Sequence, residues 1–223
     1  TPQVQKGNKA QKFKNVVYEY SLAHALQDEK YVKVPAVITR KDFDPAQYDA
    51  ETVEHIKLQD GIRLHIDTQS KLDVYGRTHN KRIVKPVVLI VARDTEHSRQ
   101  IRDFITSESF CHGAYKDKVL EINSNQSNME KDDNIELLES LEQPDNKIEI
   151  VIHVNMLKEG WDVNNLYTII PLRASASETL TEQTIGRGLR LPYGERTGVA
   201  ELDRLSIVSH DKYEAIVNLA NDP

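Results

Sequence analysis

The most restrictive feature of the sequence is the run Pro-Val-Val-Leu-Ile-Val-Ala at residues 86–92, which contains no polar side chain. A short apolar run rich in β-branched residues is typical of a strand that is buried on both faces of a parallel sheet. Further segments with strand character lie at residues 16–20, 34–38, 119–122, 148–154, 167–171 and 205–208, and a terminal helix is predicted from Asp211. Segments with helical character lie between several of them, so the sequence predicts an α/β fold with a mainly parallel sheet and helices on both faces.

The stretch 42–82 has a different character, because it is charged and its apolar residues follow no clean period. We predict a helical insertion there, within one α/β domain that spans residues 1–223. Asp94 and Thr95 are candidate N-caps of a later helix. Residues 1–14 are polar and lysine-rich and are predicted to form a flexible entry to the domain.

Composition narrows the classes of protein that the chain can represent. No apolar run reaches 18 residues, which excludes a hydrophobic membrane-spanning helix. The single cysteine, Cys111, excludes an internal disulfide and fits a reducing compartment. The formal net charge of −6 argues against tight DNA binding by this chain alone, although local phosphate contacts within a larger assembly remain compatible with it.

The segment between residues 175 and 190 carries the strongest chemical signal. Ser175 and Glu178 have the spacing of a capping box, which marks the start of a helix. On a helix, Gln183, Arg187 and Arg190 (i, i+4, i+7) would share one face. Two guanidinium groups on one face suit the stabilisation of charge on a transferred phosphoryl group, and a solvated surface helix is the alternative.

The same segment contains features that a simple surface helix would not need. Ile185 and Leu189 fall on the opposite face, where they suit packing on a sheet. Gly186 and Gly188 each destabilise a helix by about 1 kcal/mol relative to alanine. The close approach of another backbone or of a phosphate would explain the two glycines. These features favour the phosphate-facing interpretation.

A second candidate motif follows the predicted strand at 148–154. Gly160 and Asp162 stand in the segment Asn-Met-Leu-Lys-Glu-Gly-Trp-Asp-Val, residues 155–163. A glycine and an acidic residue after a strand end suit contacts with a ribose or with a network bound to phosphate. Gly-x-Asp alone is a weak signal.

Together these segments resemble the C-terminal RecA-like domain of superfamily two helicases, where a Gly-x-Asp motif precedes Gln-x-x-Gly-Arg-x-x-Arg. Residues 156–163 and 182–192 look still more like the restriction (Res) subunit of type III restriction–modification enzymes. Supporting similarity is found at residues 18–22, 32–35 and 88–95. The resemblance covers most of the chain, with the 182–192 motif the most specific part.

The resemblance implies a role for each matching residue. Arg190 would be an arginine finger on the γ-phosphate of ATP, with Arg187 beside it, and Gln183 would orient nearby groups or the attacking water. Gly160 and Asp162 would couple the nucleotide to DNA.

The resemblance also implies partners. Arg93, Asp94, Thr95 and Lys158 would face nucleic acid, which would be duplex DNA. ATP and Mg²⁺ would be held mainly by an upstream RecA-like domain of the same polypeptide, and a modification methyltransferase would be the partner subunit. The compartment would be the bacterial cytoplasm.

Some sites are absent from the sequence or weak. No Gly-x4-Gly-Lys-Ser/Thr phosphate loop is present, so we expect this chain alone to lack ATPase activity and the first motor domain and the nuclease to lie outside it. Asp145 and Glu149 imitate part of the family's Pro-Asp…Glu-x-Lys nuclease site, but Glu149 is followed by Ile150-Val151 and begins a predicted core strand. No metal-ligand spacing is found among the histidines.

Two alternatives remain open at this level. The chain could be the motor domain of a helicase or remodelling ATPase that has no nuclease. It could also be a helicase-like module kept for protein contacts, without a catalytic role.

Overall fold

The computed structural model describes residues 3–6, 9–12, 22–28, 30–122, 136–154, 163–172 and 185–210. Its centre is a six-stranded sheet in the order β3-β8-β7-β4-β6-β5, and every neighbouring pair is parallel. The strands are β3 (Val34–Ile38), β4 (Val87–Val91), β5 (Val119–Ile122), β6 (Ile150–His153), β7 (Leu166–Pro171) and β8 (Arg204–Val208). The predicted parallel sheet is therefore confirmed, and each predicted strand segment from residue 34 onward is present.

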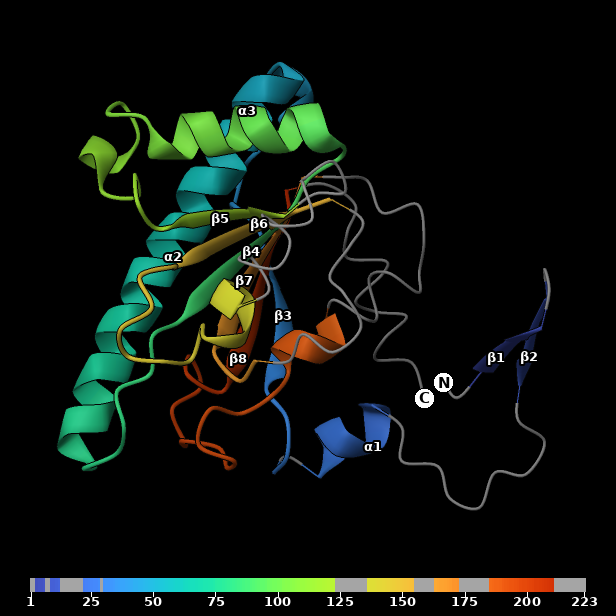
Figure 1. Ribbon diagram of the computed structural model, residues 1–223, viewed down its shortest axis with the longest axis vertical. Helices are drawn as coiled ribbons and strands as arrows, with labels where there is room; N and C mark the ends of the chain where they lie inside the picture. The colour runs from blue at the N-terminus through green and yellow to red at the C-terminus, as the bar shows by residue number, and fades with distance from the viewer. Residues whose placement is uncertain are drawn as a thin grey trace.

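The sheet has an apolar layer on each face, because side chains alternate along each strand. In β4, Val87, Leu89 and Val91 pack with the core that includes the segments near residues 138–141 and 185–189. Val88 and Ile90 pack with the opposite core, to which helices α2 (Ala50–Thr78) and α3 (Thr95–Thr106) contribute. Figure 1 shows the long helix α2 along the sheet, and the short helical turn at 185–188 in orange. All five residues of β4 are buried, as the sequence predicted.

Helix α2 lies within the stretch predicted to be helical, residues 42–82, and connects β3 to β4. Asp49 caps its first turn by accepting a hydrogen bond from the backbone N–H of Thr52 at 2.7 Å. The glycine at position 61 brings the helix against Ile170 of β7. The helix is thus part of the core, and its status as an insertion relative to other members of the fold stays a prediction.

Helix α3 begins where the sequence predicts. The Asp94 carboxylate accepts from the backbone N–H of His97 at 2.9 Å, which satisfies one of the donors at the helix start. The described residues also contain the short helix α1 (Leu22–Gln27), two 3₁₀ turns, η1 (Pro45–Gln47) and η2 (Cys111–Gly113), and helical residues at 136–139 and 185–188.

The N-terminal prediction needs correction. Strands β1 (Gln3–Lys6) and β2 (Lys9–Lys12) pair antiparallel in a separate two-stranded sheet. Backbone pairing needs no apolar side chains, which is why the polar composition of residues 1–14 did not reveal it. A strand at 16–20 and a helix from Asp211 were also predicted, and both lie outside the described residues. Among the described helices, none combines the length and apolar character required to cross a membrane.

Candidate functional site

The arginine-bearing segment lies on one face of the sheet. Residues 185–188 are helical, and Ile185 and Leu189 are buried in the core with exposures of 3% and 2%. The predicted packing of these two apolar residues is confirmed. Arg187 is half-buried and Arg190 is exposed. Gln183 lies outside the described residues.

The helical face predicted for the two arginines does not hold at Arg190. The helix ends at residue 188, and Arg190 forms an antiparallel bridge with Val32. The backbone carbonyl of Leu189 accepts a hydrogen bond from the N–H of Lys33 at 2.7 Å. This carbonyl therefore bonds to a segment distant in the sequence, and not to a following residue of the helix. Pro192 also keeps the helix from resuming, because a proline disfavours helical backbone at the residue before it, here Leu191.

The surroundings of the two glycines in this segment, Gly186 and Gly188, differ. A Cβ at position 188 would lie 2.6 Å from both Cδ atoms of Leu205 in β8, so only glycine lets the helix approach the sheet here without a shift. A Cβ at Gly186 would meet no atom within 4 Å. Packing against a side chain of the sheet, rather than a backbone or a phosphate, therefore accounts for Gly188.

A buried lysine, which the sequence did not single out, joins this segment to the sheet. Lys33 is fully buried, and its Nζ donates to the carbonyl oxygens of Asn164, Leu166 and Gly188 at 3.1, 2.8 and 3.3 Å. The same atom lies 4.0 Å from the centroid of the Tyr167 ring. The only sequence signal was its place beside the strand at 34–38, which does not distinguish it from a surface lysine.

The loop after β4, which was predicted to face nucleic acid, lies at the carboxyl edge of the sheet. The Arg93 guanidinium pairs with Glu54 of α2 at 3.1 Å, and His97 Nε2 lies 2.9 Å from the other oxygen of the same carboxylate. The backbone N–H of Arg93 donates to His97 Nδ1 at 3.2 Å, so Nε2 carries the proton and donates to Glu54. Burial raises the pKa of Glu54, but the hydrogen bond from His97 and the positive charge of Arg93 outweigh this effect and bring the pKa below its usual value.

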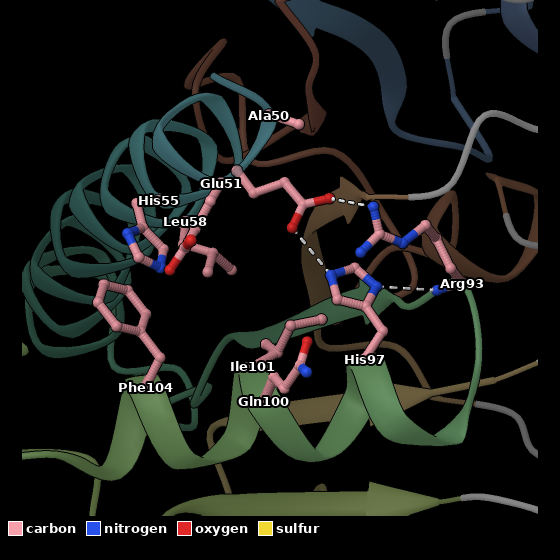
Figure 2. Close-up of a pocket in the computed structure, with 10 residues that line it drawn as sticks. Ala50, Glu51, His55, Leu58, Arg93, His97, Gln100, Ile101 and Phe104 are labelled. Atoms are coloured by element: carbon pink, nitrogen blue, oxygen red, sulfur yellow. Dashed lines mark hydrogen bonds and ion pairs between the residues drawn. The ribbon is translucent and has the colours of Figure 1, made fainter. Parts of the chain in front are cut away.

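Arg93 and His97 line a pocket of about 560 Å³ between the first turns of α2 and helix α3 (Figure 2). At its other end, the rings of His55 and Phe104 stack with centroids 3.8 Å apart. Asp94 uses its carboxylate for the helix cap, and the backbone N–H of His97 lowers the pKa of that carboxyl. The loop Arg93–Thr95 therefore offers an arginine and a helix start, with Asp94 committed to the cap.

The structure does not bring all predicted residues into one place. Arg190 lies beside Val32, just before β3, at the amino edge of the parallel sheet, whereas Arg93 follows β4 at the carboxyl edge. Lys158, Gly160 and Asp162 lie outside the described residues. Within the described part of the chain, no group of His, Cys, Asp or Glu side chains could hold a metal ion.

The structure supports the rejection of Glu149 as a nuclease residue. Its carboxylate is paired with His65 at 3.1 Å and with Lys118 at 2.6 Å, and only 12% of its side chain is exposed. This three-residue cluster connects α2 with the starts of β5 and β6. A carboxylate that is paired with both a buried histidine and a lysine has a structural role.

The pattern of strands and motifs has a direct counterpart among known families. The model of the helicase conserved C-terminal domain matches residues 74–192, which include both β4 with its loop and the arginine segment. The chain belongs to this helicase family. Strands β3 and β8 lie outside the matched range 74–192, but they belong to the same six-stranded sheet.

Relatives of the helicase domain come from restriction enzymes. The chain is 30% identical over 148 residues to the type III restriction-modification enzyme EcoPI Res subunit of Escherichia phage P1, and equally to the EcoP15I Res subunit of Escherichia coli. Each match covers 61% of this chain and 14% of the relative, so the chain spans a small part of those proteins.

A solved structure shows the same fold. A fragment of a putative HsdR subunit of a type I restriction enzyme from Vibrio vulnificus YJ016 is 20% identical, with a TM-score of 0.54. The match covers 94% of this chain and 38% of that chain. The fold is therefore RecA-like, as the resemblance of the motifs implied.

Proposed function

We propose that this helicase domain is the second motor domain of an ATP-dependent type III restriction endonuclease subunit, and that it supplies Arg187 and Arg190 to ATP held by an upstream RecA-like domain. The observation that carries the proposal is the arginine segment itself. Its apolar side is buried on the sheet, while Arg187 is half-buried and Arg190 is exposed. This arrangement suits side chains that reach a ligand bound by another domain.

The proposed chemistry divides between the two domains. Mg²⁺ and the upstream domain would hold the triphosphate. The guanidinium groups of Arg187 and Arg190 would stabilise the negative charge that develops on the transferred phosphoryl group. Gln183 would orient the attacking water, and Gly160 with Asp162 would link the nucleotide to DNA.

The proposed DNA contact is the carboxyl edge of the sheet. Arg93 and Thr95 lie there at the start of α3, and Lys158 belongs to the segment after β6. Arg93 is held by Glu54 yet keeps half of its side-chain surface exposed, which lets its guanidinium contact a phosphate without a change of the loop. Duplex DNA and a modification methyltransferase would be the partners of the complete protein.

The test uses the complete protein that contains this chain, with ATP hydrolysis measured with and without duplex DNA. We expect Arg187→Ala and Arg190→Ala each to reduce the turnover number by about 10³-fold or more. Arg77→Ala is the matched control, because Arg77 is 76% exposed at the end of α2 and pairs with Asp73. Turnover that survives both substitutions would refute the role of the arginines.

Two further measurements separate the proposal from its alternatives. DNA-stimulated hydrolysis without DNA cleavage in the presence of the methyltransferase would indicate a helicase or remodelling ATPase that lacks a nuclease. An absence of ATP hydrolysis in the complete protein would indicate a non-catalytic interaction module. The 223-residue chain alone is expected to show no ATP turnover, and robust turnover by it would contradict the proposed division between two domains.

A further inference from the structure

Lys33 has the full hydrogen-bonding complement of an ammonium ion. Its three donors meet the backbone carbonyl oxygens of Asn164, Leu166 and Gly188, and the face of the Tyr167 ring lies beside the charge. Burying a charged group is unfavourable unless it is fully hydrogen-bonded. A methionine could fill much of the same volume, but it could not bind three carbonyl groups, so the lysine is used for these contacts.

The three acceptors belong to two different parts of the fold. Leu166 begins β7 and Asn164 lies just before it, whereas Gly188 is the last helical residue of the arginine segment. The last carbonyl groups of a helix have no partners within it, and a cation near them is favourable. Lys33 therefore ties the end of this helix to the sheet.

The neighbouring backbone strengthens the same connection. The backbone N–H of Lys33 donates to the carbonyl oxygen of Leu189, and Val32 forms an antiparallel β-bridge with Arg190. Residues 188–190 are thus held at consecutive positions by residues 32 and 33. Arg187 precedes this fixed stretch and Arg190 ends it, so the direction of both side chains depends on where the stretch is held.

We propose that Lys33 is a positioning residue that fixes the arginine segment on the sheet, so that Arg187 and Arg190 are presented to the nucleotide in one arrangement. This inference rests on the proposed function of the two arginines. Its structural part, the fixing of residues 185–191, can be measured without any assay of activity.

The pH dependence of this contact follows from its surroundings. Burial lowers the pKa of Lys33 to about 7, while Asp203 before β8 and Glu142 before β6 act in the opposite direction. On β7 the facing group is Tyr167, whose phenol has a pKa raised by burial. Once the ammonium loses a proton, two donors remain for three carbonyl groups. The hold on residues 185–191 should therefore weaken as pH rises through about 7.

The experiment compares Lys33→Met with Lys30→Met in the complete protein, since Lys30 is an exposed lysine three positions earlier. We expect Lys33→Met to speed amide hydrogen exchange in residues 185–191 by about tenfold relative to β4. The turnover number for ATP should fall by about 10- to 100-fold with the KM for ATP nearly unchanged, because misplaced groups affect the chemical step. Lys30→Met should match the wild type in both measurements.

A second comparison needs no apolar substitution and applies even if Lys33→Met does not fold. In the wild type, exchange of residues 185–191 relative to β4 should become faster between pH 6 and 8. The arginine of Lys33→Arg keeps its charge throughout this pH range, so this variant should retain ATP turnover. Its relative exchange rate for residues 185–191 should not rise between pH 6 and 8. Exchange that shows no pH step in the wild type, or that changes equally in β4, would overturn the inference.

The outcomes distinguish this inference from the proposed function. If the arginine substitutions leave hydrolysis unchanged while Lys33→Met still loosens residues 185–191, the proposed function fails and the fixing role of Lys33 stands. If the arginine substitutions abolish hydrolysis while Lys33→Met changes neither exchange nor turnover, the inference about Lys33 fails alone.

Discussion

The two glycines of the arginine helix allow a direct test of how this helix is seated on the sheet. A Cβ at position 188 would lie 2.6 Å from both Cδ atoms of Leu205 and 3.2 Å from its Cγ. Leu205 is fully buried in β8, so its side chain has little room to move away. A Cβ at position 186 would meet nothing within 4 Å. Gly188→Ala and Gly186→Ala are therefore the same change in opposite surroundings.

The expected magnitudes follow from two opposing contributions. Alanine stabilises a helix by about 1 kcal/mol relative to glycine, and this gain applies to both variants. Overpacking of a closed core destabilises by about 1–3 kcal/mol, and this loss applies to Gly188→Ala alone. Because the helix contribution cancels in the comparison, Gly188→Ala should be less stable than Gly186→Ala by about 1–3 kcal/mol.

Urea unfolding of the wild type and both variants measures this difference. A third variant, Leu205→Ala, identifies the atoms responsible, because it removes the side chain that the new methyl would meet. Alone it should destabilise by about 2–5 kcal/mol, but combined with Gly188→Ala the loss should be smaller than the sum, since the methyl enters the vacated space. Equal stability of the two glycine variants, or additive losses in the double variant, would refute the packing described for this helix.

Two further predictions concern the ion pairs. Glu54→Gln removes the charge that holds Arg93, so it should increase the affinity of the complete protein for duplex DNA and steepen the salt dependence of that affinity by about one counterion. Fluorescence anisotropy across a salt series measures both the affinity and the slope. An unchanged slope would place Arg93 away from DNA. Burial raises the pKa of Glu149, but hydrogen bonds from His65 and Lys118 outweigh it and lower the pKa below 4.5. The stability from this carboxylate should therefore be present above pH 4.5 and be lost as pH falls through the lowered pKa, so urea midpoints between pH 6 and 3 should fall more steeply in the wild type than in Glu149→Gln.

Local sequence patterns were sufficient for the central elements of the fold. The apolar run at 86–92 became β4 because a strand buried on both faces needs apolar residues at every position, and this requirement is visible without knowledge of its neighbours. The cap at Asp94 was equally visible, since it involves residues three positions apart. The family resemblance of residues 182–192 pointed to the helicase family, whose model covers them.

Patterns that mix buried polar and apolar residues were less informative. Helix α2 has Lys57, His65 and Thr68 among its buried residues, so no clean apolar period marks its face. His65 can be buried because Glu149, far away in the sequence, provides its partner. Such a pairing exists only after the sheet has formed.

For the candidate site, the sequence by itself pointed to the residues that we propose for the chemistry, which are the arginines at 187 and 190 and the loop after β4, and to the apolar side on which Ile185 and Leu189 pack. The tertiary structure decided how they are presented. Arg190 does not share a helical face with Arg187, because the backbone of residues 188–190 bonds to the residues that precede β3. Lys33 lies at the centre of that contact, because its Nζ donates to carbonyl groups from two distant segments. Helical periodicity is a property of neighbours along the chain, whereas the end of this helix depends on donors that lie more than 150 residues away in the sequence.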